Sequence, residues 1–277
     1  VILGVNENGA LNVPYVGGSF DLPASDPIRH GEIGLRTHGG GYAATEAGCL
    51  CEGWGVGVPG LNYRTYANQA FSPGSSNTDP KSQTTSADSS STTVVTESYD
   101  GNIRVTHEFE PSPDSIYAFQ GTVTIKNIGG SIWPSVIYRR VMDWDISPTE
   151  FREYVTIIGT DAAMHKFSSD DGFCSPDPLG SDTCNELSSG TTNVDFVDSG
   201  PNDHGAVFDF EFNTANDPDR FPLNPGEEVT FKIYYGVAPG ELRAEQALND
   251  IGAEIASLGQ NSGATAAGPG HITGLPY

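Results

Sequence analysis

Hydrophobic and polar residues alternate along much of the chain after residue 90, and this pattern predicts β-strands. The clearest case is 103–109, where Ile103, Val105, His107 and Phe109 alternate with charged or hydroxyl-bearing residues. A period of two is typical of a half-buried strand. We expect further strands at 92–98, 117–125, 132–146, 154–158, 193–197, 206–212 and 228–237. Short strands that recur roughly every ten residues favour a sandwich of two sheets.

Two segments near the start of the chain lack this regular pattern. Residues 1–16 hold two short apolar pieces around Asn8-Gly9, a strong hairpin-turn signal, so we expect an N-terminal extended arm or hairpin there. Residues 71–93 are nearly all Ser, Thr, Asp, Asn and Gly. A segment of that composition has little apolar surface to bury, so we expect a long mobile loop.

One stretch near the end has helical spacing. Apolar residues recur three and four positions apart between 241 and 258, at Ala244, Leu248, Ile251, Ile255 and Leu258. Gly259 follows, where a C-terminal cap favours glycine. We therefore predict a mainly β protein: a large antiparallel β-sandwich over 17–260 that includes one C-terminal α-helix at 241–258. Residues 261–277 are small and polar and predict a flexible tail.

The charge of the chain excludes several classes of partner. The formal net charge is −23, from 36 acidic and 13 basic residues. A nucleic-acid partner or an anionic lipid surface requires the opposite sign, so we expect neither. The sequence contains no run of about twenty apolar residues, so we also predict no membrane span.

The cysteines indicate disulfides in an exported protein. The chain opens at Val1 rather than Met, which we interpret as removal of a leader, and it has four cysteines. Cys174 and Cys184 bracket a polar loop and could close it locally. Cys49 and Cys51 are too close together for an easy bridge, so crossed pairing between the two clusters and a zinc site both remain open.

The densest polar cluster lies in YRRVMDWDISPTEF. On an extended strand Asp143 and Asp145 share a face about 7 Å apart. Two such carboxylates could bind calcium or act as an acid/base pair on a glycosidic bond, with Glu150 as a further candidate acid. The interpretation that the sequence favours is structural: Arg139, on the same face, neutralises them.

Other candidate sites carry weaker signals. Asp170, Asp171, Asp177 and Asp182 could form a second calcium site, but the spacing of an EF-hand loop is missing, which favours solvated acids. No metal-binding histidine pair, phosphate-binding loop or nucleophile elbow occurs. The three tryptophans could form a sugar-stacking platform, although burial in the core is the more common role.

Three blocks of sequence resemble a known group of proteins. They are GCLCEGWGVGV, YRRVMDWDISPTEFREYVTIIGT, and GPNDHGAVFDFEF with the later NPGEEVTFKIYYGVA and ALNDIGAEIASLGQ. Together they resemble uncharacterised secreted bacterial proteins of the PEP-CTERM-associated type. The resemblance implies export to the cell surface or extracellular space and implies no reaction. The chain ends without the anchor that such proteins carry, so we expect release or assembly.

The sequence therefore supports three hypotheses about function. The first is an extracellular structural or matrix protein that assembles with copies of itself into filaments, through strand exchange or edge pairing at Val1, Ile2, Leu3 and Val5. The second is a calcium-dependent carbohydrate-binding module or adhesin that binds extracellular polysaccharide. The third is a glycan-active enzyme that uses Asp143, Asp145 and Glu150.

Overall fold

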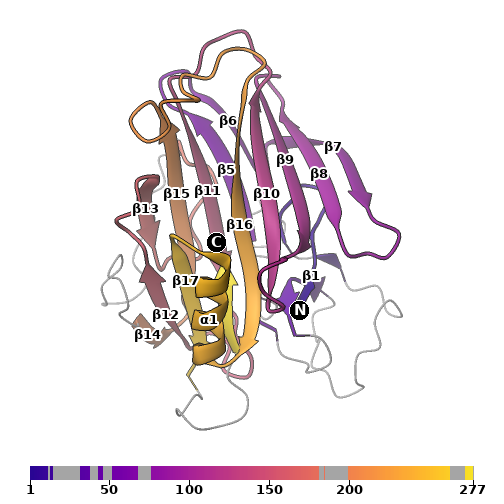
Figure 1. Cartoon of the computed structure of the whole chain (residues 1–277), viewed down its shortest axis with the longest axis vertical. Helices are drawn as coiled ribbons and strands as arrows, with labels where there is room; N and C mark the ends of the chain where they lie inside the picture. Colours follow the sequence, from indigo (N-terminus) through magenta and orange to yellow (C-terminus); the bar gives the residue numbers. More distant parts are fainter. Residues whose placement is uncertain are drawn as a thin grey trace.

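The computed structural model describes residues 1–11, 13–14, 32–37, 43–45, 52–67, 76–180, 184, 199–262 and 272–276. These residues form a β-sandwich in which a nine-stranded and a five-stranded antiparallel sheet pack face to face (Figure 1). Two small two-stranded sheets and one α-helix complete the described part. The predicted fold class, a mainly β sandwich with a C-terminal helix, is confirmed.

The two large sheets are built from strands that are distant in sequence. The order of the five-stranded sheet is β13-β15-β11-β5-β6, with β5 (Glu52–Val58), β6 (Tyr63–Ala67), β11 (Ser135–Asp143), β13 (His165–Ser169) and β15 (Gly205–Asn213). The order of the nine-stranded sheet is β14-β12-β17-β18-β16-β10-β9-β8-β7. Its strands are β7 (Thr78–Thr85), β8 (Thr92–Ser98), β9 (Ile103–Pro111), β10 (Ala118–Asn127), β12 (Glu153–Ile158), β14 (Ser199–Asn202), β16 (Glu228–Pro239), β17 (Ala256–Asn261) and β18 (Ile272–Pro276).

The core between the sheets follows the alternation of the sequence. In β9, Ile103, Val105 and Phe109 are buried, whereas Glu108 is exposed. The three tryptophans are fully buried, so they form no sugar-stacking platform. The disulfide Cys174–Cys184 confirms the predicted local closure of that loop. Cys49, Cys51, Asp182 and the predicted strand at 193–197 lie outside the described residues.

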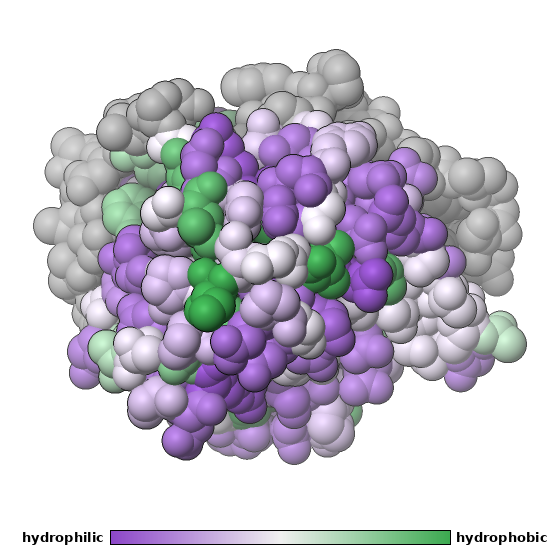
Figure 2. All heavy atoms as spheres, turned by 90° about the horizontal axis from the view of Figure 1, so that it is seen from above, coloured by the Kyte–Doolittle hydropathy of each residue, from purple (hydrophilic) through white to green (hydrophobic). Residues whose placement is uncertain are grey.

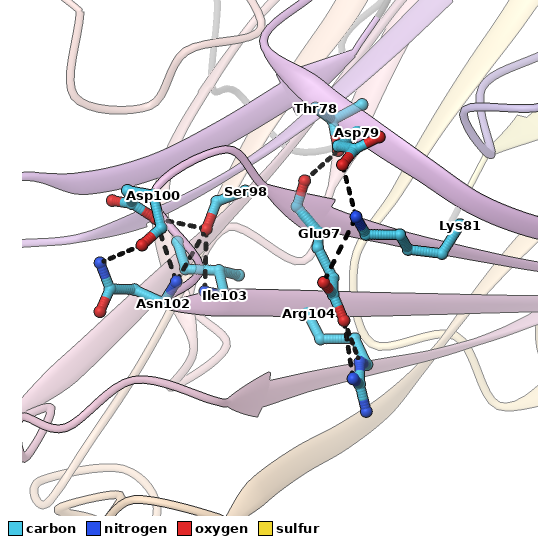
Figure 3. Close-up of polar contacts among 9 residues, drawn as sticks. All are labelled: Thr78, Asp79, Lys81, Glu97, Ser98, Asp100, Asn102, Ile103 and Arg104. Carbon is cyan, nitrogen blue, oxygen red and sulfur yellow. Dashed lines mark hydrogen bonds and ion pairs between the residues drawn. The ribbon is translucent and has the colours of Figure 1, made fainter.

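The polar segment predicted as a mobile loop is ordered over 76–93. Strand β7 pairs with β8 at the edge of the nine-stranded sheet, and its outer residues are exposed. The side chain of Lys81 contacts Asp79 and Glu97, and Arg104 donates to Glu97 at 2.7 and 2.8 Å (Figure 3). The prediction was wrong because an edge strand needs little apolar surface, and β-branched threonines suit it. Its lysine and its bulge near Pro80 discourage pairing with another chain.

The C-terminal helix is shorter than predicted. Helix α1 (Glu241–Ile251) ends at Gly252, whose left-handed φ of 66° closes it. The predicted residues 252–258 are therefore not helical, and Leu258 lies in strand β17. Gly259 is not a cap either: a side chain there would come within 2.6 Å of the Trp144 ring. Among the residues that the structure describes, no helix has the length and apolar character needed to cross a lipid bilayer.

The predicted flexible tail contributes a strand. Strand β18 lies inside the nine-stranded sheet, between β17 and β16. Its five residues pair with Tyr235–Pro239 of β16, and two of them also pair with β17. The prediction for 261–277 therefore fails at 272–276, because the sheet supplies partners that the local sequence does not show.

The predicted N-terminal hairpin is present and forms part of the core. Val5 and Leu11 form an antiparallel bridge across a turn in which Gly9 has a φ of +78°. Before this turn, β1 (Ile2–Leu3) pairs with β4 (Leu35–Arg36), and after it β2 (Val13–Pro14) pairs with β3 (Glu32–Ile33). The Trp54 indole donates to the carbonyl of Asn8 at 2.8 Å. The turn is therefore fixed to the five-stranded sheet.

A fully buried ion pair completes this attachment. The Arg140 guanidinium of β11 lies 2.5 Å from the Glu52 carboxylate of β5. The other Glu52 oxygen accepts a hydrogen bond from the Leu11 amide at 2.5 Å, and Arg140 also donates to the Gly9 carbonyl at 3.4 Å. The Tyr235 hydroxyl of β16, in the opposite sheet, donates to Glu52 at 2.7 Å. This network therefore joins both sheets and the N-terminal turn.

His107 of β9 extends the network in the nine-stranded sheet. Its Nε2 lies 3.1 Å from the Tyr138 hydroxyl, which accepts a hydrogen bond from Arg140 at 3.0 Å. Burial, together with the charge of Arg140, lowers the pKa of His107 well below its usual value. The imidazole is therefore neutral, so Glu52 is balanced by a single positive charge.

We predict that Arg140→Met destabilises the protein by about 3–5 kcal/mol, because it leaves the buried Glu52 charge without its partner. The double variant Glu52→Gln/Arg140→Met should recover part of that loss. The partly exposed pair of Arg104 and Glu97 supplies the matched control, and Arg104→Met should cost less than about 1 kcal/mol. Urea denaturation measures all three variants. Equal losses for the two arginine variants would contradict the role assigned to the buried pair.

Candidate metal centre

Three carboxylates meet where the chain passes between the two sheets. Oxygen atoms of Asp143, Asp145 and Asp203 all lie within 4.8 Å of one another. Asp143 is the last residue of β11, and Asp145 follows it after one residue. Asp203 lies between β14 of the nine-stranded sheet and β15 of the five-stranded sheet. The predicted neighbours Asp143 and Asp145 are therefore joined by a third acid from a distant segment.

Backbone hydrogen bonds hold these segments in place. The amide of Asp145 donates to the carbonyl of Ala44 at 2.9 Å, and Asp145 also forms a parallel bridge with Thr45. The amide of Trp144 donates to the carbonyl of His204 at 3.0 Å. These bonds fix the backbone on either side of Asp145 and hold it next to the segment that carries Asp203.

Burial is complete at two acids of the cluster, Asp145 and Glu153. Asp145 is 0 % exposed, and neither of its carboxylate oxygens has a hydrogen-bond partner among the described residues. Glu153, the first residue of β12, is also 0 % exposed; one of its oxygens accepts a hydrogen bond from the Ile146 amide at 3.2 Å, and the other has no partner in the part of the chain that the structure describes. Asp203 is partly exposed, so the cluster reaches solvent on that side. An unpartnered buried carboxylate is strongly destabilising unless it is protonated or binds a cation.

Burial and mutual repulsion raise the pKa values of the carboxylates in this cluster. Burial raises the pKa of Asp145 to about 8, and the carboxylates of Glu153, Asp203 and Glu150 contribute to this rise. Burial also raises the pKa of Glu153 to about 8. The pKa of Asp143 is raised by burial and then by Asp145, Asp203 and Glu153. The neighbouring charges that raise the pKa values of Asp143 and Asp145 are thus carboxylates.

Arg139 does not neutralise the cluster. It forms a bidentate pair with Asp209 of β15, with nitrogen–oxygen distances of 2.6 and 2.8 Å, and it also donates to the Ser175 carbonyl at 2.9 Å. The structural interpretation favoured from the sequence is therefore wrong. A neighbouring strand provides Arg139 with an acid of its own, and strand periodicity alone gives no sign of that partner.

The other predicted acids have separate partners. Asp170 lies 3.1 Å from Nδ1 of His204, Asp171 accepts from the Phe173 amide at 2.9 Å, and Asp177 pairs with Arg64 at 3.0 Å. The described residues therefore do not bring Asp170, Asp171 and Asp177 together as a second metal site.

Sequence reasoning missed Asp203 and Glu153. Asp203 belongs to the GPNDHG segment, which lies far from Asp143 and Asp145 in the sequence. Glu153 lies eight residues beyond Asp145, on a strand of the other sheet. Local sequence could not place either residue, because the chain reversal between β11 and β12 and the crossover from β14 to β15 bring them to the cluster.

Comparison with known proteins identifies no relative. No family model matches the chain, and no curated protein or solved structure matches it.

The chemistry of the donors points to a hard cation. Carboxylate oxygens are the preferred ligands of Ca²⁺ and Mg²⁺, whereas Zn²⁺ prefers nitrogen and sulfur. Catalysis on a sugar is not favoured, since Asp143 and Asp145 are 4 % and 0 % exposed. Glu150, the third acid of that hypothesis, accepts a hydrogen bond from the Ser147 hydroxyl at 2.8 Å.

We predict that, in the presence of a chelator, stability falls as pH rises from about 4 to about 8. The pKa of Asp145 is about 8 in the folded protein, whereas that of a free aspartate side chain is 3.8. The folded state therefore binds more protons than the unfolded state across this window, and it loses that advantage as pH rises. Each such group contributes a slope of up to about 1.4 kcal/mol per pH unit.

Urea denaturation at a series of pH values measures this slope. Asp145→Asn, which removes one of the coupled acids, should flatten it. A stability that rises steadily between pH 4 and pH 8 in chelator would show that the cluster is not protonated in the folded protein.

Proposed function

We propose that this chain is an extracellular structural β-sandwich protein that binds one calcium ion at Asp143, Asp145 and Asp203, with Glu153 beside them. One observation carries the proposal: Asp145 is fully buried, both of its carboxylate oxygens lack a hydrogen-bond partner among the described residues, and the groups that act on it are carboxylates. A divalent cation would replace the protons that such a cluster otherwise has to retain.

Calcium fits this donor set better than the other common cations do. It takes six to eight oxygen ligands in a flexible arrangement, at about 2.3–2.6 Å, and it accepts several carboxylates together. Magnesium requires near-octahedral geometry and keeps several waters, which a mostly buried cluster does not accommodate easily. Partly exposed Asp203 supplies the route by which the ion enters and the side on which water completes the coordination.

The position of the cluster supports a structural role for the ion. Asp143 ends β11 and Asp145 follows it, Asp203 lies in the β14–β15 connection, and Glu153 begins β12. An ion there would link the five-stranded sheet to the nine-stranded sheet at the corner where the chain crosses between them. Any ligand that binds only the folded state stabilises it, by about 2.7 kcal/mol at a hundred times its Kd. Extracellular calcium sites with millimolar Kd are sufficient for an exported protein.

We predict that calcium raises the melting temperature at pH 8 by roughly 5–10 °C at saturation. Asp203→Asn and Asp145→Asn should each abolish most of this shift, because each removes a charged ligand. In chelator at pH 8, however, Asp145→Asn should be more stable than the unchanged protein, because it relieves repulsion among buried carboxylates.

Differential scanning fluorimetry and calorimetric titration with CaCl₂ test this prediction. Asp161→Asn, an exposed acid in a loop outside the cluster, is the matched control and should retain the full shift. Absence of both binding heat and thermal shift, or an equal response of the Asp203→Asn variant, would overturn the calcium site.

A further inference from the structure

An apolar groove opens along the seam between the two sheets. It has a volume of about 260 Å³, and its apolar lining includes Phe210, Phe212, Phe231, Ile233, Ile251 and Ile255. The first two come from β15 and the next two from β16, so opposite sheets form its walls. The turn after α1 closes one end. In Figure 1 this seam lies between β15 and β16, above α1.

The backbone edge beside this groove is open. Strand β16 pairs with β10 over 228–236 and, on its other side, with β18 only over Tyr235–Pro239. Beyond that, the carbonyl of Thr230 accepts a hydrogen bond from Arg220 at 3.2 Å. Between these contacts, residues 231–234 have no strand partner on this side within the described parts of the chain. An open edge beside an apolar groove is a template for an added strand.

The charge of the protein restricts which segment can dock there. Two copies that each carry a net charge of −23 repel one another, so the docking segment must bring no further negative charge. Residues 1–5, with the sequence VILGV, have no charged side chain, and the first acid of the chain is Glu7. Their β-branched and apolar side chains suit a strand whose alternate residues enter an apolar groove.

Segment 1–5 is held in its own chain by a short set of contacts. Strand β1 pairs with β4 through two residues, the Gly4 amide donates to the Gly34 carbonyl at 2.8 Å, and Gln83 donates to the Val5 carbonyl at 3.0 Å. Val1, Leu3 and Val5 are partly buried against the core, whereas residues 6–11 are held by the buried network around Arg140. Exchange of segment 1–5 into a second copy therefore exposes the apolar surface that it covers, and the groove has to compensate for that loss.

We infer that residues 1–5 of one copy add as a strand to residues 231–234 of β16 in a second copy, with their apolar side chains in the groove. This inference is independent of the calcium site. Segment 1–5 lies beside Gln83, Thr85, Phe109 and Phe119, and none of these residues lines the groove. Donor and acceptor surfaces are thus different, which gives a head-to-tail contact that can propagate into open filaments.

The end of the molecule seen from above offers no comparable surface among the described residues. Figure 2 shows mainly hydrophilic residues there, with hydrophobic ones in small separate groups.

A peptide with the sequence VILGV and a charged solubilising tail tests the acceptor directly. It should bind a variant that lacks residues 1–5, measured by fluorescence anisotropy, whereas a scrambled peptide should bind at least tenfold more weakly. Ala253→Glu places a charge in the groove lining and should weaken binding at least tenfold. Ala215→Glu, at an exposed site away from the groove, is the matched control and should leave binding unchanged.

Sedimentation and electron microscopy of the full chain test the assembly itself. The unchanged protein should form polymers, and the variant lacking residues 1–5 and the Ala253→Glu variant should both be monomers. The Ala253→Glu variant should keep its urea midpoint, whereas deletion of residues 1–5 should lower the midpoint, because Val1, Leu3 and Val5 pack against the core. Polymers that persist without residues 1–5 but disappear without 272–277 would overturn the inference and identify β18 as the donor. A monomeric full chain with no peptide binding would overturn it altogether.

Discussion

The buried pair of Arg140 and Glu52 is the constraint on which the rest of the fold depends. Removing two charges from water costs several kcal/mol for each ion, and their attraction offsets this cost only when the remaining donors and acceptors are satisfied. Here the Leu11 amide, the Gly9 carbonyl and the Tyr235 hydroxyl satisfy them. These partners come from the N-terminal turn and from the opposite sheet. The pair therefore requires that the sheets face each other in this register and that the turn is in place.

Strand β11 shows a second arrangement of buried charge only a few residues away. Arg140 has its counter-ion within the chain, whereas Asp143 and Asp145 are surrounded by other acids. Removing either partner of the first arrangement leaves an isolated charge in the core. In the second arrangement Asp145 has no hydrogen-bond partner among the described residues, so protons or a cation have to balance its charge. The first arrangement therefore needs nothing from the medium, while the second makes stability depend on the pH and the cations of the medium.

The sequence correctly predicted strands in which buried and exposed residues alternate. It did not predict strands whose pairing partners lie far away in the sequence. Strand β9 was correct because half of its residues face the core, and Asn8-Gly9 marked a real turn. Strand β7 was missed because an exposed edge strand has no apolar face, and strand β18 because its partners lie far away in sequence. In the candidate site, spacing along one strand could pair Asp143 with Asp145. Asp203 joins them because the chain crosses between the sheets, which the local sequence does not show. Arg139 does not pair with them because Asp209, on the neighbouring strand β15, binds it instead.

The large negative charge connects the two proposals. Repulsion between exposed charges acts over about 8 Å at physiological ionic strength, so acidic copies can approach closely only where the contact itself is uncharged. The groove is lined mostly by aromatic and aliphatic side chains, and its two charged residues, Lys232 and Glu254, have opposite signs. Together with a segment that has no charged side chain, it gives a contact without net charge. A divalent ion bound at Asp143, Asp145 and Asp203 would stabilise so acidic a protein, because it offsets negative charge in the interior without exposing apolar surface. Calcium in the medium would therefore stabilise the folded chain by binding to it directly. Salt would favour the contact with a second copy, because it screens the repulsion between the two acidic chains.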